Sequence, residues 1–168
     1  MKAALCLLCA AALAAASPLE VPFYRQEKNG CGAASLAMVM HYWADHYALP
    51  ETESPRPAAV YDELYQPRLR GIPLATMRDY AESHGFHAFT FRGGAADLEE
   101  HLARGRPVLI GLRKKPSANL HFAVLTGMDG NRVWLNDPSK NKPSTMVRKK
   151  FDRQWAAADH WLLLVAPR

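Results

Sequence analysis

Apolar residues at helical spacing dominate the first part of the chain. A buried helix is predicted over residues 32–43, because apolar side chains recur there at three- and four-residue intervals: Leu36, Val39, Met40 and Trp43. Two further helices are predicted over residues 58–65 and 73–85. The second would begin at Pro73, which suits a first helical turn, and end at Gly85, which suits the left-handed residue after a helix.

The rest of the chain is dominated by shorter apolar segments that are typical of β-strands. Residues 86–91 alternate aromatic with polar or small side chains, and a helix is predicted after them, over 95–104. Four more segments rich in Val, Leu, Ile and Trp predict strands at 107–112, 121–128, 132–136 and 161–165. The turn Asp129-Gly130-Asn131 predicts an antiparallel hairpin, and a last helix is predicted near 150–158. Helices followed by antiparallel strands indicate an α+β domain.

The N-terminal segment "MKAALCLLCAAALAAA" has the pattern of a secretory signal peptide. Lys2 precedes an apolar run that is too short for a membrane-spanning helix of ~20 residues, and small residues follow at 14–16. We therefore expect a signal peptide over residues 1–16 and a single domain over 17–168, located in the periplasm or secreted. No later stretch approaches membrane length, so no membrane span is predicted.

The formal net charge of +5 does not indicate a nucleic-acid-binding protein. The basic residues are scattered apart from two clusters, at 113–115 and 148–150, and no aromatic platform interleaves with either cluster. Solvated loop charge is the simpler interpretation.

The positions of the three cysteines limit the roles that Cys31 can have. Cys6 and Cys9 lie in the predicted signal peptide, which leaves Cys31 without a partner in the mature monomer. A lone thiol in an oxidising compartment is a liability unless it is buried, paired between chains or used chemically. For the monomer, Cys31 is therefore either an inert core residue or a reactive thiol.

Both interpretations of Cys31 fit its immediate surroundings. A thiol in the first turn of a helix faces the positive end of the helix dipole, which lowers its pKa. Gly30 and Gly32 remove side chains from both flanks, so a substrate backbone could approach closely. A small core residue at a tight turn has the same local sequence.

His121 is the histidine best placed to act as a base. It opens a strand of apolar residues, beside a hairpin that ends in Asn136-Asp137-Pro138. A three-residue loop would pair Met128 with Arg132 and place His121 and Asp137 on one face, ~7–8 Å apart. A two-residue loop would separate them unless a bulge intervened.

Other histidines have simpler structural explanations on predicted helices or at their ends: His41, His46, His84 and His101. Gln26, in contrast, adds a candidate oxyanion donor. Its amide, together with the backbone N–H of Cys31, could bind the oxyanion of an acyl-transfer reaction.

Gln26, "CGAASLAMVMHYW", "HFAVLTG" and "NDP" together resemble the papain-like cysteine peptidases of family thirty-nine, the double-glycine or bacteriocin-processing peptidases. The resemblance implies a papain-like fold, with N-terminal helices that carry the nucleophile packed on a C-terminal antiparallel sheet. It also implies that Cys31 is the nucleophile, His121 the general base and acid, Asp137 the group that orients His121, and Gln26 an oxyanion donor. No metal ion or organic cofactor is implied. The implied substrates are precursor peptides cut after Gly-Gly through a thioester.

The chain departs from the exporter-fused members of that family, because it shows no transmembrane or ATP-binding region. We therefore expect a stand-alone secreted peptidase that acts on a peptide or protein. Two alternatives remain open at this point: an acyl transferase or amidase of the same architecture, and a non-catalytic peptide-binding module.

Overall fold

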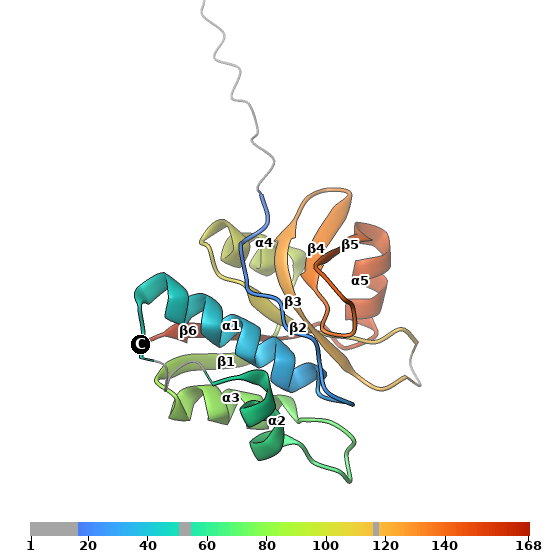
Figure 1. Cartoon of the computed structure of the whole chain (residues 1–168). Coiled ribbons are helices and arrows are strands. Elements are labelled where there is room, and N and C mark those ends of the chain that lie inside the picture. Colours follow the sequence, from blue (N-terminus) through green and yellow to red (C-terminus); the bar gives the residue numbers. More distant parts are fainter. Residues whose placement is uncertain (1–16, 51–54, 116–117) are drawn as a thin grey trace, which may run out of the picture.

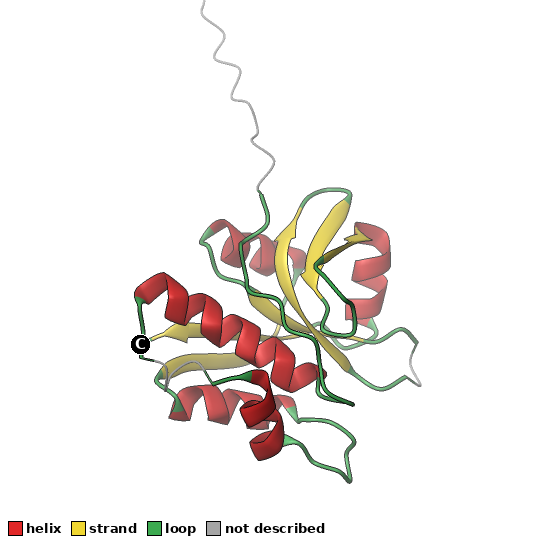
Figure 2. Ribbon diagram, in the orientation of Figure 1, coloured by secondary structure: helices red, strands yellow, loops and turns green. Residues whose placement is uncertain are grey.

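The computed structural model describes residues 17–50, 55–115 and 118–168, so the predicted signal peptide at 1–16 lies outside the described residues. The elements, labelled in Figure 1 and coloured by type in Figure 2, are α1 (Cys31–Tyr47), α2 (Pro57–Leu64), α3 (Leu74–Ser83), β1 (Phe86–Arg92), α4 (Ala95–Ala103), β2 (Val108–Leu112), β3 (His121–Met128), β4 (Arg132–Asn136), β5 (Ser144–Val147), α5 (Arg148–Ala156) and β6 (Trp161–Pro167).

The strands form one antiparallel six-stranded sheet in the order β1-β6-β2-β3-β4-β5. The last strand, β6, lies between β1 and β2, so the C-terminal segment closes the centre of the sheet. The predicted strands are all present, whereas β5 was not predicted. The last helix begins at Arg148 instead of near residue 150.

Helices cover both faces of the sheet. The long helix α1 packs on one face together with α2 and α3, against Leu109, Phe122 and Leu163. α4 and α5 pack on the other face, against the neighbouring strand residues Ile110, Ala123 and Leu162. Because β2, β3 and β6 are buried on both faces, their sequences are continuous apolar runs with little alternation.

The first described segment, residues 17–26, runs along β3 and β4 and leads the chain to α1 (Figure 1). Its Leu19 N–H donates to the Thr126 carbonyl at 2.8 Å. The buried amide of Asn136 donates to the Val21 carbonyl at 2.9 Å. These bonds fix the path of the chain just before Gln26.

The β3–β4 hairpin reaches the expected arrangement by a different route. Met128 pairs with Val133 and not with Arg132. The pairing with Val133 corresponds to a hairpin whose tip has two residues. Thr126 is then an extra residue in β3, and this bulge shifts the register so that Val124 pairs with Asn136. The Thr126 carbonyl is the one that accepts from Leu19. The bulge therefore restores the face shared by His121 and Asp137 that a two-residue tip alone would lose.

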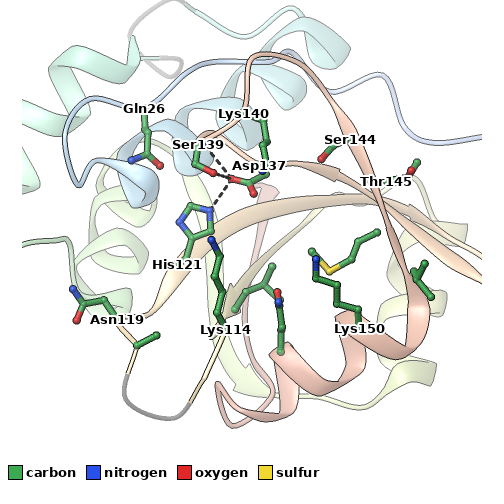
Figure 3. A pocket seen from close by; sticks show the side chains of 15 residues that line it. Gln26, Lys114, Asn119, His121, Asp137, Ser139, Lys140, Ser144, Thr145 and Lys150 are labelled. Atoms are coloured by element: carbon green, nitrogen blue, oxygen red, sulfur yellow. Dashed lines mark hydrogen bonds and ion pairs between the residues drawn. The ribbon is translucent and has the colours of Figure 1, made fainter.

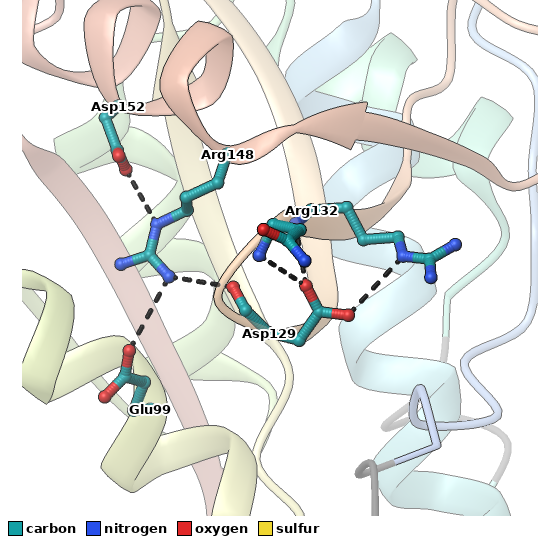
Figure 4. A network of polar contacts seen from close by, with 6 residues as sticks. Glu99, Asp129, Arg132, Arg148 and Asp152 are labelled. Carbon is teal, nitrogen blue, oxygen red and sulfur yellow. Dashed lines mark hydrogen bonds and ion pairs between the residues drawn. The ribbon is translucent and has the colours of Figure 1, made fainter.

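Arg148 holds the tip of this hairpin against two helices (Figure 4). Its guanidinium donates to the Asp129 carbonyl at 3.1 Å and forms ion pairs with Asp152 in α5 at 2.9 Å and Glu99 in α4 at 3.6 Å. The Asp129 carboxylate accepts from the backbone N–H groups of residues 131 and 132, which closes the turn. Arg148, which belongs to the basic cluster at 148–150, therefore has a structural role.

Candidate active site

A tight turn places Cys31 at the start of α1. The Gly30 N–H donates to the Glu27 carbonyl at 2.9 Å, and Asn29 adopts a left-handed conformation with φ of 60°. Asparagine tolerates this conformation better than most residues, as a turn of this type requires. The hydroxyl of Tyr61 in α2 donates to the Lys28 carbonyl at 3.0 Å and holds the turn from outside.

The two glycines that flank Cys31 allow close packing of the neighbouring helices, a role that the sequence analysis did not predict. A Cβ on Gly30 would lie 2.8 Å from the ring of Tyr61. A Cβ on Gly32 would lie 2.9 Å from the sulfur of Met77 and 3.3 Å from Ile72. The glycines therefore let α2 and α3 approach the beginning of α1.

The thiol of Cys31 is partly buried and hydrogen-bonded to the ring of His121. Burial alone raises the pKa of Cys31, but the hydrogen bond and charge of His121 oppose it, together with backbone N–H groups of Phe122 and Gly32. The pKa of Cys31 is therefore lowered from its ordinary value. A thiolate is favoured at this position.

His121 is hydrogen-bonded to both Cys31 and Asp137. Figure 3 shows its bond to Asp137. Its Nε2 is 2.7 Å from Oδ1 of Asp137, which leaves Nδ1 for the thiol. Burial lowers the pKa of His121, but the bonds to Asp137 and Cys31 outweigh burial and raise it to about 9. The side chains of His121 and Asp137 are only 26% and 12% exposed, so solvent screens this pair weakly.

Ser139 completes the surroundings of Asp137. Oδ1 of Asp137 accepts from the Ser139 N–H at 3.0 Å and from the Ser139 hydroxyl at 2.7 Å, besides His121. Burial raises the pKa of Asp137, but the hydrogen bonds and charge of His121, with the bonds from Ser139, lower it to about 2. Ser139 was missed at the sequence level. Asp-Pro-Ser is a turn in which the first side chain bonds to the backbone two residues on, and that signal could have found it.

Gln26 lies beside the same dyad. Its backbone N–H donates to the Pro138 carbonyl at 3.0 Å, next to Asp137. The side-chain Oε1 is buried, and no described group donates a hydrogen bond to it. Its side chain lines both hollows that adjoin His121. The sequence prediction that Cys31, His121, Asp137 and Gln26 lie together therefore agrees with the geometry.

Two hollows open on either side of His121. The first, about 380 Å³, is lined by Cys31 and by the loop 69–74. The second, about 750 Å³, is lined by Asp137, Ser139 and parts of β5 and α5, and not by Cys31. Both volumes lie in the range of about 300–1,000 Å³ that is typical of ligand sites.

Two of the other histidines have local structural partners, as expected. His41 lies 2.5 Å from the hydroxyl of Tyr24, and Nδ1 of His84 lies 2.8 Å from the Tyr80 carbonyl. Within residues 17–50, 55–115 and 118–168, no three His, Cys, Asp or Glu side chains gather closely enough to hold a metal ion. The helices described over the same ranges include none of the length and apolarity needed to cross a membrane.

The chain that carries this thiol, imidazole and carboxylate is also similar to known proteins. The model of the Peptidase C39 like family matches residues 18–161. The chain belongs to this family. The C39-like domain is similar to the Lactococcin-G-processing and transport ATP-binding protein LagD of Lactococcus lactis subsp. lactis, with 23% identity over 133 residues. The match covers 79% of this chain and 17% of the length of LagD.

Two solved structures share the fold of the C39-like domain. The double glycine motif protease from an AMS/PCAT transporter, in complex with the leader peptide, has a TM-score of 0.70 and 24% identity and covers 90% of this chain and 95% of that one. The peptidase domain of Streptococcus ComA, a bi-functional ABC transporter involved in a quorum sensing pathway, has a TM-score of 0.67 and 20% identity and covers 88% and 98%. The fold is therefore the papain-like α+β fold of C39 peptidases.

Proposed function

We propose that the C39-like domain is a cysteine peptidase that cleaves a peptide or protein after small residues such as Gly-Gly. The observation that carries this proposal is the hydrogen-bonded chain from Cys31 through His121 to Asp137. It supplies an activated nucleophile, a group that accepts and returns a proton, and a carboxylate that holds the ring in one orientation.

In the proposed reaction, the Cys31 thiolate attacks the carbonyl carbon of the scissile bond. The amide of Gln26 and the backbone N–H of Cys31 donate to the resulting oxyanion. When the C–N bond breaks, the leaving amine takes the proton from Nδ1 of His121, and the acyl group remains on sulfur as a thioester. His121 then accepts a proton from water, the hydroxide attacks the thioester, and the freed thiolate receives its hydrogen bond from His121 again.

Two features support small residues before the cut. The hollow beside Cys31 is about half the volume of the other, and its rim includes Gly71, Pro73 and Leu120. The double glycine motif protease that shares the fold was solved with the leader peptide. Residues 1–16 have the pattern of a signal peptide, and we propose on that basis that the enzyme acts outside the cytoplasm.

The proposal is tested with a quenched fluorescent peptide that contains Leu-Gly-Gly before a variable segment. We expect time-dependent cleavage, with mass spectrometry placing the cut after the second glycine. Hydroxylamine in the same assay separates hydrolysis from acyl transfer, because a hydroxamate product shows that an amine competes with water for the thioester. If Cys31 is alkylated rapidly at low pH and the peptide is bound but not cleaved, the peptidase proposal is contradicted and the domain is a peptide-binding protein without turnover.

Gln26→Ala is expected to lower kcat/KM by about 10²–10³-fold, the usual loss when one oxyanion donor is removed. The alkylation rate of Cys31 should change little, because Gln26 is not among the groups that lower the pKa of the thiol. Gln26→Glu is the matched control, since it keeps the shape and places a negative charge where the oxyanion forms. Activity retained in Gln26→Glu would show that Gln26 only fills space.

A further inference from the structure

The larger hollow beside His121 is rimmed by lysines from three separate segments (Figure 3). Lys114 follows β2, Lys140 lies in the turn after Asp137, and Lys150 belongs to α5. In Figure 3 the side chains of Lys114 and Lys150 rise toward His121 and the middle of the hollow. The floor adds apolar surface from Leu112 and Met146.

The positive charge of this hollow is not neutralised within the described parts of the chain. Asp137 is the only carboxylate that lines it, and its Oδ1 already accepts from His121 and Ser139. Among the ion pairs of the described residues, none involves Lys114, Lys140 or Lys150. Like charges around a concave surface concentrate a positive potential there and attract anionic groups.

The two basic clusters of the sequence divide in a way that supports this assignment. Arg113 donates to the Ala157 carbonyl at 3.2 Å and Arg148 holds the hairpin, so both arginines are structural. The neighbouring Lys114 and Lys150 line the hollow. The third members, Lys115 and Lys149, are exposed and do not line it, which makes them matched controls.

The positions of Cys31 and His121 indicate which part of the substrate this hollow would hold. The acyl part of the substrate stays bonded to the sulfur of Cys31, which lines only the smaller hollow. The leaving amine receives its proton from His121, which lines both. The segment that follows the cut is therefore directed past His121 into the lysine-rimmed hollow.

We propose that this hollow binds the substrate segment that follows the cut and selects acidic side chains in its first few residues. This inference rests on the proposed peptidase function for its direction, and it names the substrate class: a peptide with Asp or Glu after the small residues. The apolar floor accommodates the methylene groups of those side chains, while the lysines pair with their carboxylates.

The experiment uses fluorescein-labelled peptides and the full chain with Cys31→Ala, which cannot turn them over. One peptide has the sequence Gly-Gly-Asp-Glu-Asp-Ala, and its isosteric partner has Gly-Gly-Asn-Gln-Asn-Ala. We expect the acidic peptide to bind about tenfold more tightly in low salt. Two or three partly exposed ion pairs together account for a difference in affinity of this size. The preference should fall as added salt screens the charges.

The lysine variants decide whether the hollow is responsible. Lys140→Gln with Lys150→Gln should reduce the preference to about twofold, whereas Lys115→Gln with Lys149→Gln should leave it near tenfold. Equal binding of the two peptides, no saturable binding of the acidic one, or an equal loss in both double variants would overturn the inference.

Failure of the proposed function is detected separately. Wild-type protein that cleaves neither peptide, while Cys31→Ala keeps the acidic preference, would contradict the peptidase proposal and leave the acidic-peptide site standing. Wild-type protein that cleaves both peptides with equal kcat/KM, together with equal binding, would support the peptidase and remove the acidic selectivity.

Discussion

The Cys31→Ala variant is expected to lose peptide hydrolysis by at least about 10⁴-fold in kcat/KM while it keeps its fold. The thioester cannot form without the sulfur, and direct attack by water would have only the oxyanion donors and His121 to assist it. The fold should survive, because alanine is favourable in a helix and the substitution leaves unchanged Gly32, the glycine that lets Met77 pack closely. Progress curves with the Leu-Gly-Gly peptide, and the melting temperature by circular dichroism, measure the two quantities.

Cys31→Ser is the control for the chemistry of the sulfur. It retains a polar atom of similar size beside His121, but a hydroxyl ionises far less readily than a thiol, so we expect a comparable loss of activity. Hydrolysis within about tenfold of wild type in either variant would show that Cys31 does not carry the reaction. A loss of activity accompanied by a large fall in melting temperature would show a structural role for the residue instead.

Much of the fold could be predicted because burial on two faces leaves a clear pattern in the sequence. β2, β3 and β6 are apolar along their whole length, and α1 repeats apolar residues at helical spacing. β5 escaped prediction because it is a four-residue edge strand that alternates half-buried and exposed positions. The place of β6 between β1 and β2 depends on contacts between distant segments, which no local pattern contains.

The members of the candidate site could be predicted, but their geometry could not. His121 and Asp137 were expected to share a face through a three-residue loop, and the bulge at Thr126 achieves this with a shorter tip. That bulge is supported by a hydrogen bond from Leu19, more than a hundred residues earlier in the chain. The bond from Nε2 of His121 to Asp137 and the backbone N–H of Phe122 beside the sulfur also join segments that are distant in the sequence, and no local pattern contains them.

The His121→Ala variant is expected to slow the alkylation of Cys31 at pH 6 by on the order of 10²-fold. In the wild type, thiolate and imidazolium coexist over a range of pH. The lower limit of this range is the lowered pKa of Cys31, and the upper limit is the pKa of His121, about 9. The rate should therefore rise through the lowered thiol pKa, remain level, and change again near pH 9 as the ring loses its proton. Iodoacetamide labelling from pH 4 to 10, followed by mass spectrometry, measures this profile.

Without His121, burial remains and raises the pKa of Cys31, while only the backbone N–H groups of Phe122 and Gly32 oppose it. The alkylation rate should then follow a single thiol pKa at or above the ordinary value of about 8.5. Asp137→Asn should give an intermediate profile, because the ring remains but loses the carboxylate that raises its pKa. His87→Ala, on the exposed side of β1, is the matched control and should leave the profile unchanged. A wild-type profile that His121→Ala does not alter would mean that no ion pair forms, and the hydrogen-bonded chain would then orient a peptide-binding surface without activating a nucleophile.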